Sequence, residues 1–181
     1  MARMVEFPGP KGRVRGYVAK PEKPAPGVLI LHPGKLEDLE AFSERISAEG
    51  FVALVPDLTY GQPPVRDASS LDGQTAVDVA ASAAGLLLGQ SGLEGNRIGI
   101  MAFGSAVPVA TTLAGLTPQT IGAMVVFSET AEAADLEHLE IPAQAQQAAV
   151  DPTRRETLED DPADKALRGA LDFFREHLTA S

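Results

Sequence analysis

The sequence predicts an α/β fold with a mainly parallel central sheet and helices on both faces. Its apolar runs are continuous rather than alternating, which is typical of parallel strands buried on both faces; they span residues 27–31, 51–56, 97–103 and 122–127. Segments with helical spacing separate these runs, and this alternation favours a doubly covered parallel sheet. Because no repeat or linker divides the chain, we expect one domain over residues 1–181.

The first half of the chain supplies two further elements. Residues 12–20 alternate enough to form an early strand, and the proline-rich segment 21–26 forms a turn. A helix follows the first buried strand, because four apolar residues recur there at helical spacing: Leu36, Leu39, Phe42 and Ile46. We expect Gly50 to end this helix as a left-handed cap.

The second half predicts three helices and one weak strand. An alanine-rich helix over 73–90 buries a stripe of Val77, Ala81, Ala84 and Leu88. The next helix spans 105–115, with Pro108 inside its first turn. Residues 142–151 form a weak strand whose glutamines suit a sheet edge. The last helix, over 163–178, has one apolar face: Ala166, Leu167, Ala170, Leu171 and Phe174.

Composition excludes several classes of function. The net charge is −10, from 15 basic and 25 acidic residues, which argues against nucleic-acid or anionic-membrane partners. There is no cysteine, so we expect no disulfide, thiolate catalysis or cysteine-ligated metal. The N-terminus lacks a secretion-signal pattern and no apolar run is long enough to cross a bilayer. We therefore expect a cytoplasmic protein without a cofactor or metal.

The stretch "RIGIMAFGSAVPVA" (97–110) predicts a buried strand that passes through a tight turn into a helix. Such a turn carries a nucleophile between small residues two positions away on either side, because strand and helix approach closely. Here Ala102 and Ala106 are the small residues and Gly104 stands between them. Glycine has no side chain that can attack a substrate, and it relieves the strain of the turn's backbone angles.

Three stretches together resemble the dienelactone hydrolase family of α/β-hydrolases: "PAPGVLILHPGKLEDLEAFSERISAEGFVALVPDLTYGQ", "AVDVAASAAGLLLGQSGLEGNRIGIMAFGSA" and "IPAQAQQAAVD". The resemblance covers about residues 10 to 151 in order, and "GFVALVPDL" is its most specific part. It implies the α/β-hydrolase fold, a three-layer sandwich. It also implies hydrolysis of small lactones and esters by a Cys or Ser nucleophile, an Asp and a His.

The family's catalytic residues carry over poorly. The nucleophile position matches Gly104, and the acid matches Asp151. No residue matches the histidine, which in the family follows one more strand. Only "PTRRETLEDDP" separates Asp151 from the last helix, which is too short for a helix, a strand and a catalytic loop. We therefore expect the sheet to be truncated at the last strand.

Other residues are candidates for a rearranged catalytic site. Ser105 follows the centre of the turn, although its side chain more readily caps or packs the helix. His32 ends the first buried strand, where it either props the loop or acts as an acid or base. Asp151 either orients a histidine or belongs to an ordinary Asp-Pro turn. The candidate binding residues are His32, Pro33, Gly34, Phe103, Gly104, Ser105 and Tyr60.

The sequence is compatible with three functions. The first is a non-catalytic protein that binds a small carboxylate, ester or lactone, or a protein partner. The second is an active hydrolase of small esters or lactones that uses Ser105 or a water activated by His32. The third is a structural or regulatory subunit that associates, for example as a homodimer, through the exposed sheet edge.

Overall fold

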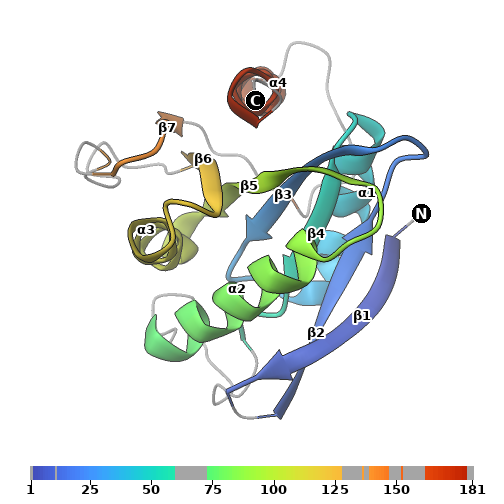
Figure 1. Cartoon of the computed structure of the whole chain (residues 1–181), viewed down its shortest axis with the longest axis vertical. Coiled ribbons are helices and arrows are strands. Elements are labelled where there is room, and N and C mark those ends of the chain that lie inside the picture. The colour runs from blue at the N-terminus through green and yellow to red at the C-terminus, as the bar shows by residue number, and fades with distance from the viewer. Residues whose placement is uncertain are drawn as a thin grey trace.

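The computed structural model describes residues 2–10, 12–59, 73–127, 136, 139–146, 152 and 162–178. Within them, seven strands form one sheet in the order β1-β2-β4-β3-β5-β6-β7 (Figure 1). The strands are β1 (Ala2–Gly9), β2 (Gly12–Ala19), β3 (Ala25–Leu31), β4 (Val52–Pro56), β5 (Leu93–Phe103), β6 (Ile121–Phe127) and β7 (Ala143–Gln146). The neighbouring strands from β4 to β7 in this order pair parallel, whereas β2 pairs antiparallel with both β1 and β4. The predicted fold class is confirmed.

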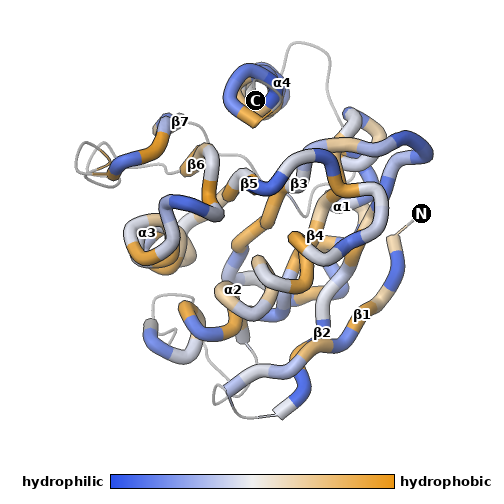
Figure 2. The backbone as a smooth tube through the Cα atoms, viewed as in Figure 1, coloured by the Kyte–Doolittle hydropathy of each residue, from blue (hydrophilic) through white to orange (hydrophobic). Residues whose placement is uncertain are grey.

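Helices cover both faces of the sheet and give three layers. The helices are α1 (Glu40–Ala48), α2 (Gly73–Leu88), α3 (Val107–Leu116) and α4 (Pro162–Leu178), with short 3-10 turns η1 (Leu36–Leu39) and η3 (Gly104–Ala106). One core cluster joins the sheet to α2 and α3, and a second joins it to α1 and α4. Because both faces are covered, every residue of β3 and β6 is buried, which explains their continuous apolar sequences (Figure 2).

A glycine in β5 lets α4 approach the sheet. A Cβ atom on Gly99 would lie 2.6 Å from Cε1 of Phe174, so any side chain there would displace that ring. Phe174 is fully buried and meets Phe51 edge-on, with ring centroids 6.4 Å apart. The predicted apolar face of the last helix is largely confirmed: Leu167, Ala170, Leu171 and Phe174 are buried, and Ala166 is half-buried.

Two predictions about the elements need correction. The strand β1 was not expected, because Phe7 is its only buried residue and its sequence therefore lacks a clear apolar alternation. The predicted stripe of α2 is wrong at Ala81, which is exposed, and at Leu88, which is half-buried. The helix instead buries Ala76, Ala80, Ala83 and Leu87. With alanines on nearly every side, the sequence does not determine which side of α2 faces the sheet.

The strand β7 ends the sheet in the part of the chain that the structure describes. Of the predicted strand 142–151, residues 143–146 form β7, and residues 147–151 lie outside the described residues. Its neighbour in the sheet is β6, and the next described element is α4. None of the described helices is long and apolar enough to span a membrane.

Candidate active site at the carboxyl edge of the sheet

The candidate residues meet where β3 and β5 end. These strands are neighbours and run parallel, with Leu31 of β3 paired to Ala102 of β5. The loop that begins at His32 therefore lies beside the turn that begins at Gly104. In open α/β sheets ligands bind at this edge, outside the carboxyl ends of the strands.

The turn after β5 has the backbone of a nucleophile elbow. Phe103 is extended, Gly104 has φ +54°, and η3 leads directly into α3. Ala102 and Ala106 are fully buried, so the strand and the helix approach each other through their methyl groups. An added Cβ on Gly104, an exposed residue, would have Pro33 Cγ as its nearest neighbour, at 4.0 Å. The turn thus has open space beside its central residue.

Ser105 does not point into that space. Its Oγ is buried and has no hydrogen-bond partner among the residues that the structure describes. A side chain that caps a helix would hydrogen-bond an amide of the first turn, and neither η3 nor α3 has such a cap. The hydroxyl of Ser105 is therefore packed inside the elbow, whereas a nucleophile must be accessible to its substrate.

His32 holds its own loop in shape. Its Nδ1 accepts a hydrogen bond of 2.8 Å from the backbone N–H of Gly34. The imidazole also packs against Phe103, with ring centroids 5.5 Å apart. A Cβ on Gly34 would lie 2.8 Å from Nδ1 and Cε1 of the ring, so the glycine is needed for the loop to curl this tightly. Since Nδ1 accepts, the neutral ring carries its proton on Nε2. This geometry fits the loop-propping interpretation of His32.

Phe103 lies in the core rather than in a binding site. It is 3% exposed, stacks on Phe127 with centroids 4.9 Å apart, and meets Phe42 edge-on at 5.8 Å. Successive strand residues point to opposite faces, so Phe103 faces α1 and α4 whereas Ala102 faces α2 and α3. The structure therefore does not support the predicted binding role of Phe103.

The remaining candidates divide into two groups. Pro33 and Gly34 are partly exposed in the loop after β3, beside the elbow. Tyr60 and Asp151 lie outside the described residues. The structure thus brings together His32, Pro33, Gly34, Gly104 and Ser105. The hydrogen bond from Gly34 to His32 was not predicted, and the tripeptide His-Pro-Gly is its only signal in the sequence.

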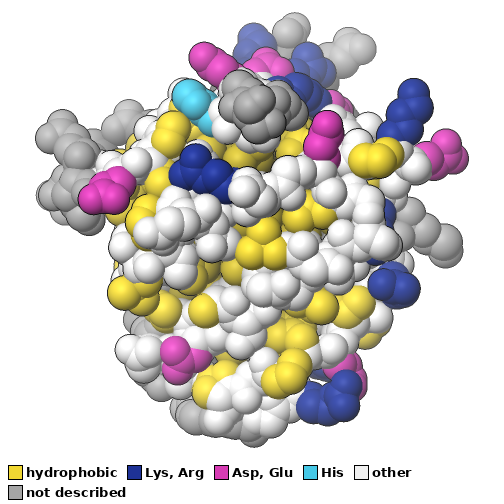
Figure 3. Space-filling view, in the orientation of Figure 1, with side chains coloured by type: hydrophobic (Ala, Val, Ile, Leu, Met, Phe, Trp, Pro, Cys, Tyr) yellow, Lys and Arg dark blue, Asp and Glu magenta, His cyan; other side chains and the backbone are white. Residues whose placement is uncertain are grey.

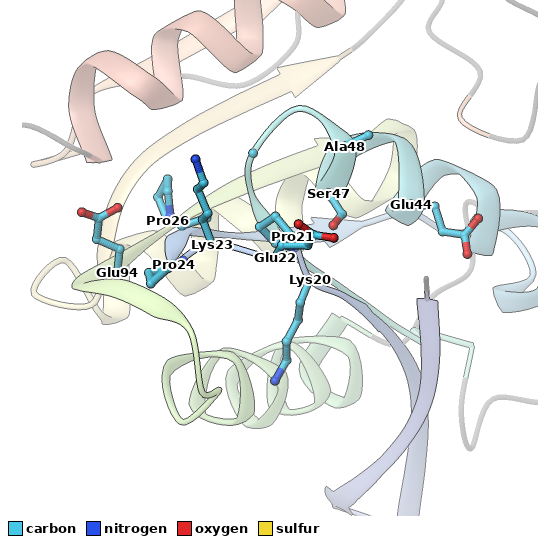
Figure 4. A pocket seen from close by; sticks show the side chains of 12 residues that line it. Lys20, Pro21, Glu22, Lys23, Pro24, Pro26, Glu44, Ser47, Ala48 and Glu94 are labelled. Carbon is cyan, nitrogen blue, oxygen red and sulfur yellow. The ribbon is translucent and has the colours of Figure 1, made fainter.

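A pocket of about 640 Å³ lies at the opposite edge of the sheet (Figure 4). It is lined by the turn between β2 and β3, the end of α1 and the start of β5, and none of the predicted site residues borders it. Its charged residues have both signs: Lys20, Glu22, Lys23, Glu44 and Glu94. Because neither charge dominates, and because this edge holds the amino ends of the parallel strands, we place the candidate site at the elbow.

A parallel sheet between two helical layers, with an elbow after β5 and a loop after β3, defines an α/β-hydrolase. The chain belongs to the dienelactone hydrolase family, whose family model matches residues 14–170. This family and fold are those that the sequence predicts.

Relatives agree with this assignment. The chain is 37% identical over 67 residues to a putative carboxymethylenebutenolidase of Aquifex aeolicus, a match that covers 34% of this chain and 29% of that protein. It is 32% identical over 87 residues to the putative hydrolase fragment YghX of Escherichia coli, covering 43% of this chain and 74% of the fragment. The chain thus spans less than a third of the Aquifex relative.

A solved structure matches the whole fold. The crystal structure of a putative dienelactone hydrolase from Klebsiella pneumoniae has a TM-score of 0.73. The match covers 98% of this chain and 99% of that one. At 16% sequence identity it shows a shared fold and nothing finer.

The elbow geometry predicts opposite reactivities for two neighbouring positions. The chain has no cysteine, so Gly104→Cys and Ser105→Cys each introduce a unique thiol. We expect iodoacetamide to alkylate Gly104→Cys readily. In Ser105→Cys we expect alkylation to be at least about tenfold slower, because a buried thiol reacts only after local opening. In denaturant the two thiols should react alike. Equal rates in the folded proteins would contradict the buried placement of Ser105.

Proposed function

We propose that the chain is a non-catalytic member of the dienelactone hydrolase family that binds a small carboxylate, ester or lactone at the elbow. One observation carries this proposal. The elbow keeps its backbone, with φ +54° at its centre, but the central residue is Gly104 and has no side chain.

The neighbouring residues do not replace the missing nucleophile in this arrangement. The Oγ of Ser105 is buried, and Nδ1 of His32 is engaged by the N–H of Gly34. Nucleophilic catalysis needs a nucleophile within hydrogen-bond reach of its base. Removing a single member of a triad typically costs several orders of magnitude in rate. The absence of a side chain at Gly104 therefore favours binding over turnover.

The same edge of the sheet is suited to an oxygen-rich ligand. The first amides of a helix have no partners within the helix, and its dipole favours negative charge there. At the elbow, an exposed glycine leaves room for a ligand oxygen to approach the first turn of η3. The Aquifex relative is named for a butenolide that bears a carboxyl group, and such a molecule is both a lactone and a carboxylate.

Ordinary ester hydrolysis is the competing proposal, and an activity assay separates the two. The purified protein is exposed to a fluorophosphonate probe and a panel of short acyl esters and lactones. We expect no labelling and no turnover above the buffer rate, in the wild type as in Ser105→Ala. Turnover by the wild type that Ser105→Ala loses would show that the buried hydroxyl becomes exposed during reaction, and the non-catalytic proposal would be wrong.

Binding at the elbow predicts a specific loss of ligand stabilisation. A small lactone or carboxylate at about 100 times its Kd should stabilise the fold by about 2.7 kcal/mol, seen as a rise in Tm. In Gly104→Leu the new side chain fills the space beside Pro33, and this rise should disappear.

The matched control for that variant is Gly95→Leu. Gly95 also has a positive φ, +84°, and an added Cβ there would meet nothing within 4 Å. It lies near the start of β5, at the other end of the strand from the elbow. Both variants place a leucine at a positive φ, but only Gly95→Leu should keep the ligand-induced rise in Tm. A rise that persists in Gly104→Leu would place the ligand elsewhere.

A further inference from the structure

The two helical layers differ sharply in their number of charged residues, although the helices of each layer have a net charge of −1. The helices α1 and α4 have 9 and 17 residues, and nine of these are charged: Glu40, Glu44, Arg45, Asp164, Lys165, Arg168, Asp172, Arg175 and Glu176. The helices α2 and α3 have 16 and 10 residues, and Asp78 is their one charged residue. In Figure 2, α4 is largely blue whereas α2 and α3 are mainly white and orange. The layer of α2 and α3 is thus almost without charged residues.

This layer has an open outer surface. The helices α2 and α3 pack against each other and form one continuous face. Its exposed residues are small, polar or apolar: Gln74, Ala81, Gly85, Pro108, Thr112, Gly115 and Leu116. Leu116 is 68% exposed, and it is one of two large hydrophobic residues exposed among the described residues. Figure 3 shows mainly white and yellow atoms over these helices. We call this surface the α2–α3 face.

Two glycines on this face have no packing role among the described residues. Gly85 lies inside α2 and Gly115 inside α3, and an added Cβ on either would meet nothing within 4 Å. Neither has the positive φ that would require glycine. Glycine inside a helix lowers its stability relative to alanine. Close approach of another molecule's backbone is a physical reason to have glycine at such positions.

From these observations we propose that the α2–α3 face is the interface of a homodimer. Two copies with net charge −10 repel wherever their charged surfaces meet. A two-fold contact places the same patch against itself, and the α2–α3 face can be buried there almost without desolvating charges, whereas the charge-rich layer of α1 and α4 cannot. The charges of the opposite layer already pair within the chain, as in Arg45–Asp164 and Arg175–Glu49. The dimer would keep those layers apart.

Other occupants fit this face less well. A basic partner would be attracted to the acidic surfaces, and the α2–α3 face offers it only Asp78. A membrane-surface helix carries Lys or Arg on its polar side and large apolar residues on the other. Neither α2 nor α3 contains a basic residue.

The size of the face sets the expected strength. At 1.5 Å per residue α2 is about 24 Å long, and two helices roughly 10 Å apart offer on the order of 500 Å² per copy. About 1,000 Å² in total is at the small end for a specific interface. We therefore expect a reversible dimer in the micromolar range. Because the copies repel overall, added salt should tighten the dimer rather than weaken it.

Sedimentation equilibrium across the micromolar range tests the proposal with a matched pair of variants. Ala81 of α2 and Ala41 of α1 are both exposed alanines in helices. Ala81→Glu places two new carboxylates in the interface and should raise the dissociation constant at least about tenfold, whereas Ala41→Glu should leave it unchanged. Circular dichroism checks that both variants are folded.

A second variant distinguishes a weaker dimer from a folding defect. Gly85→Ala should melt at the same or a higher temperature, because alanine favours the helix and meets no atom of its own chain. It should nevertheless weaken the dimer, because its methyl groups hold the two helices apart. A wild type that remains monomeric throughout the micromolar range would overturn the proposal. So would a dimer that Ala81→Glu leaves intact, since the contact would then lie elsewhere, such as the edge strand β7.

Discussion

The left-handed turn at Gly104 is the constraint on which the candidate site depends. It joins β5 to α3 at φ +54°, and the methyl groups of Ala102 and Ala106 are fully buried on either side of it. A residue with a side chain would strain this turn, and hydrolases of this class accept that strain because it presents the nucleophile. Here the turn is kept with the residue that relieves the strain. The turn also holds the start of η3 beside the loop from His32 to Gly34.

The loop from His32 to Gly34 also depends on a glycine. Gly34 lets the backbone reach Nδ1 of His32, and Phe103 supports the imidazole from below. Phe103 in turn stacks on Phe127 in the layer that α1 and α4 cover. The candidate site is therefore fixed by the core beneath it. The α2–α3 face is the outer surface of the other helical layer, and of its exposed residues Pro108, in the first turn of α3, directly follows the elbow.

Sequence patterns predicted the elements whose residue types are set mainly by burial on both faces or by close backbone packing. The strands β3, β4 and β6 follow from burial on both faces, and the elbow follows from two small residues around Gly104. Patterns failed where burial is weak or ambiguous. β1 buries only Phe7, and alanines surround α2 so evenly that Ala81 was assigned to the wrong side. Phe103 is predicted as a binding residue because it precedes Gly104 in the sequence. Strand alternation, however, directs its side chain into the core.

The most direct test of the central claim locates the ligand on the folded chain. Amide resonances are followed by NMR while a small lactone or carboxylate is titrated into the protein. A ligand held by the elbow should shift Gly34, Gly104, Ser105 and Ala106 together, with a single Kd. The pocket at the amino edge provides the contrast, because Lys20, Lys23 and Glu94 line it. Shifts confined to those residues, or no shift at Gly104 at saturation, would contradict a binding site at the elbow.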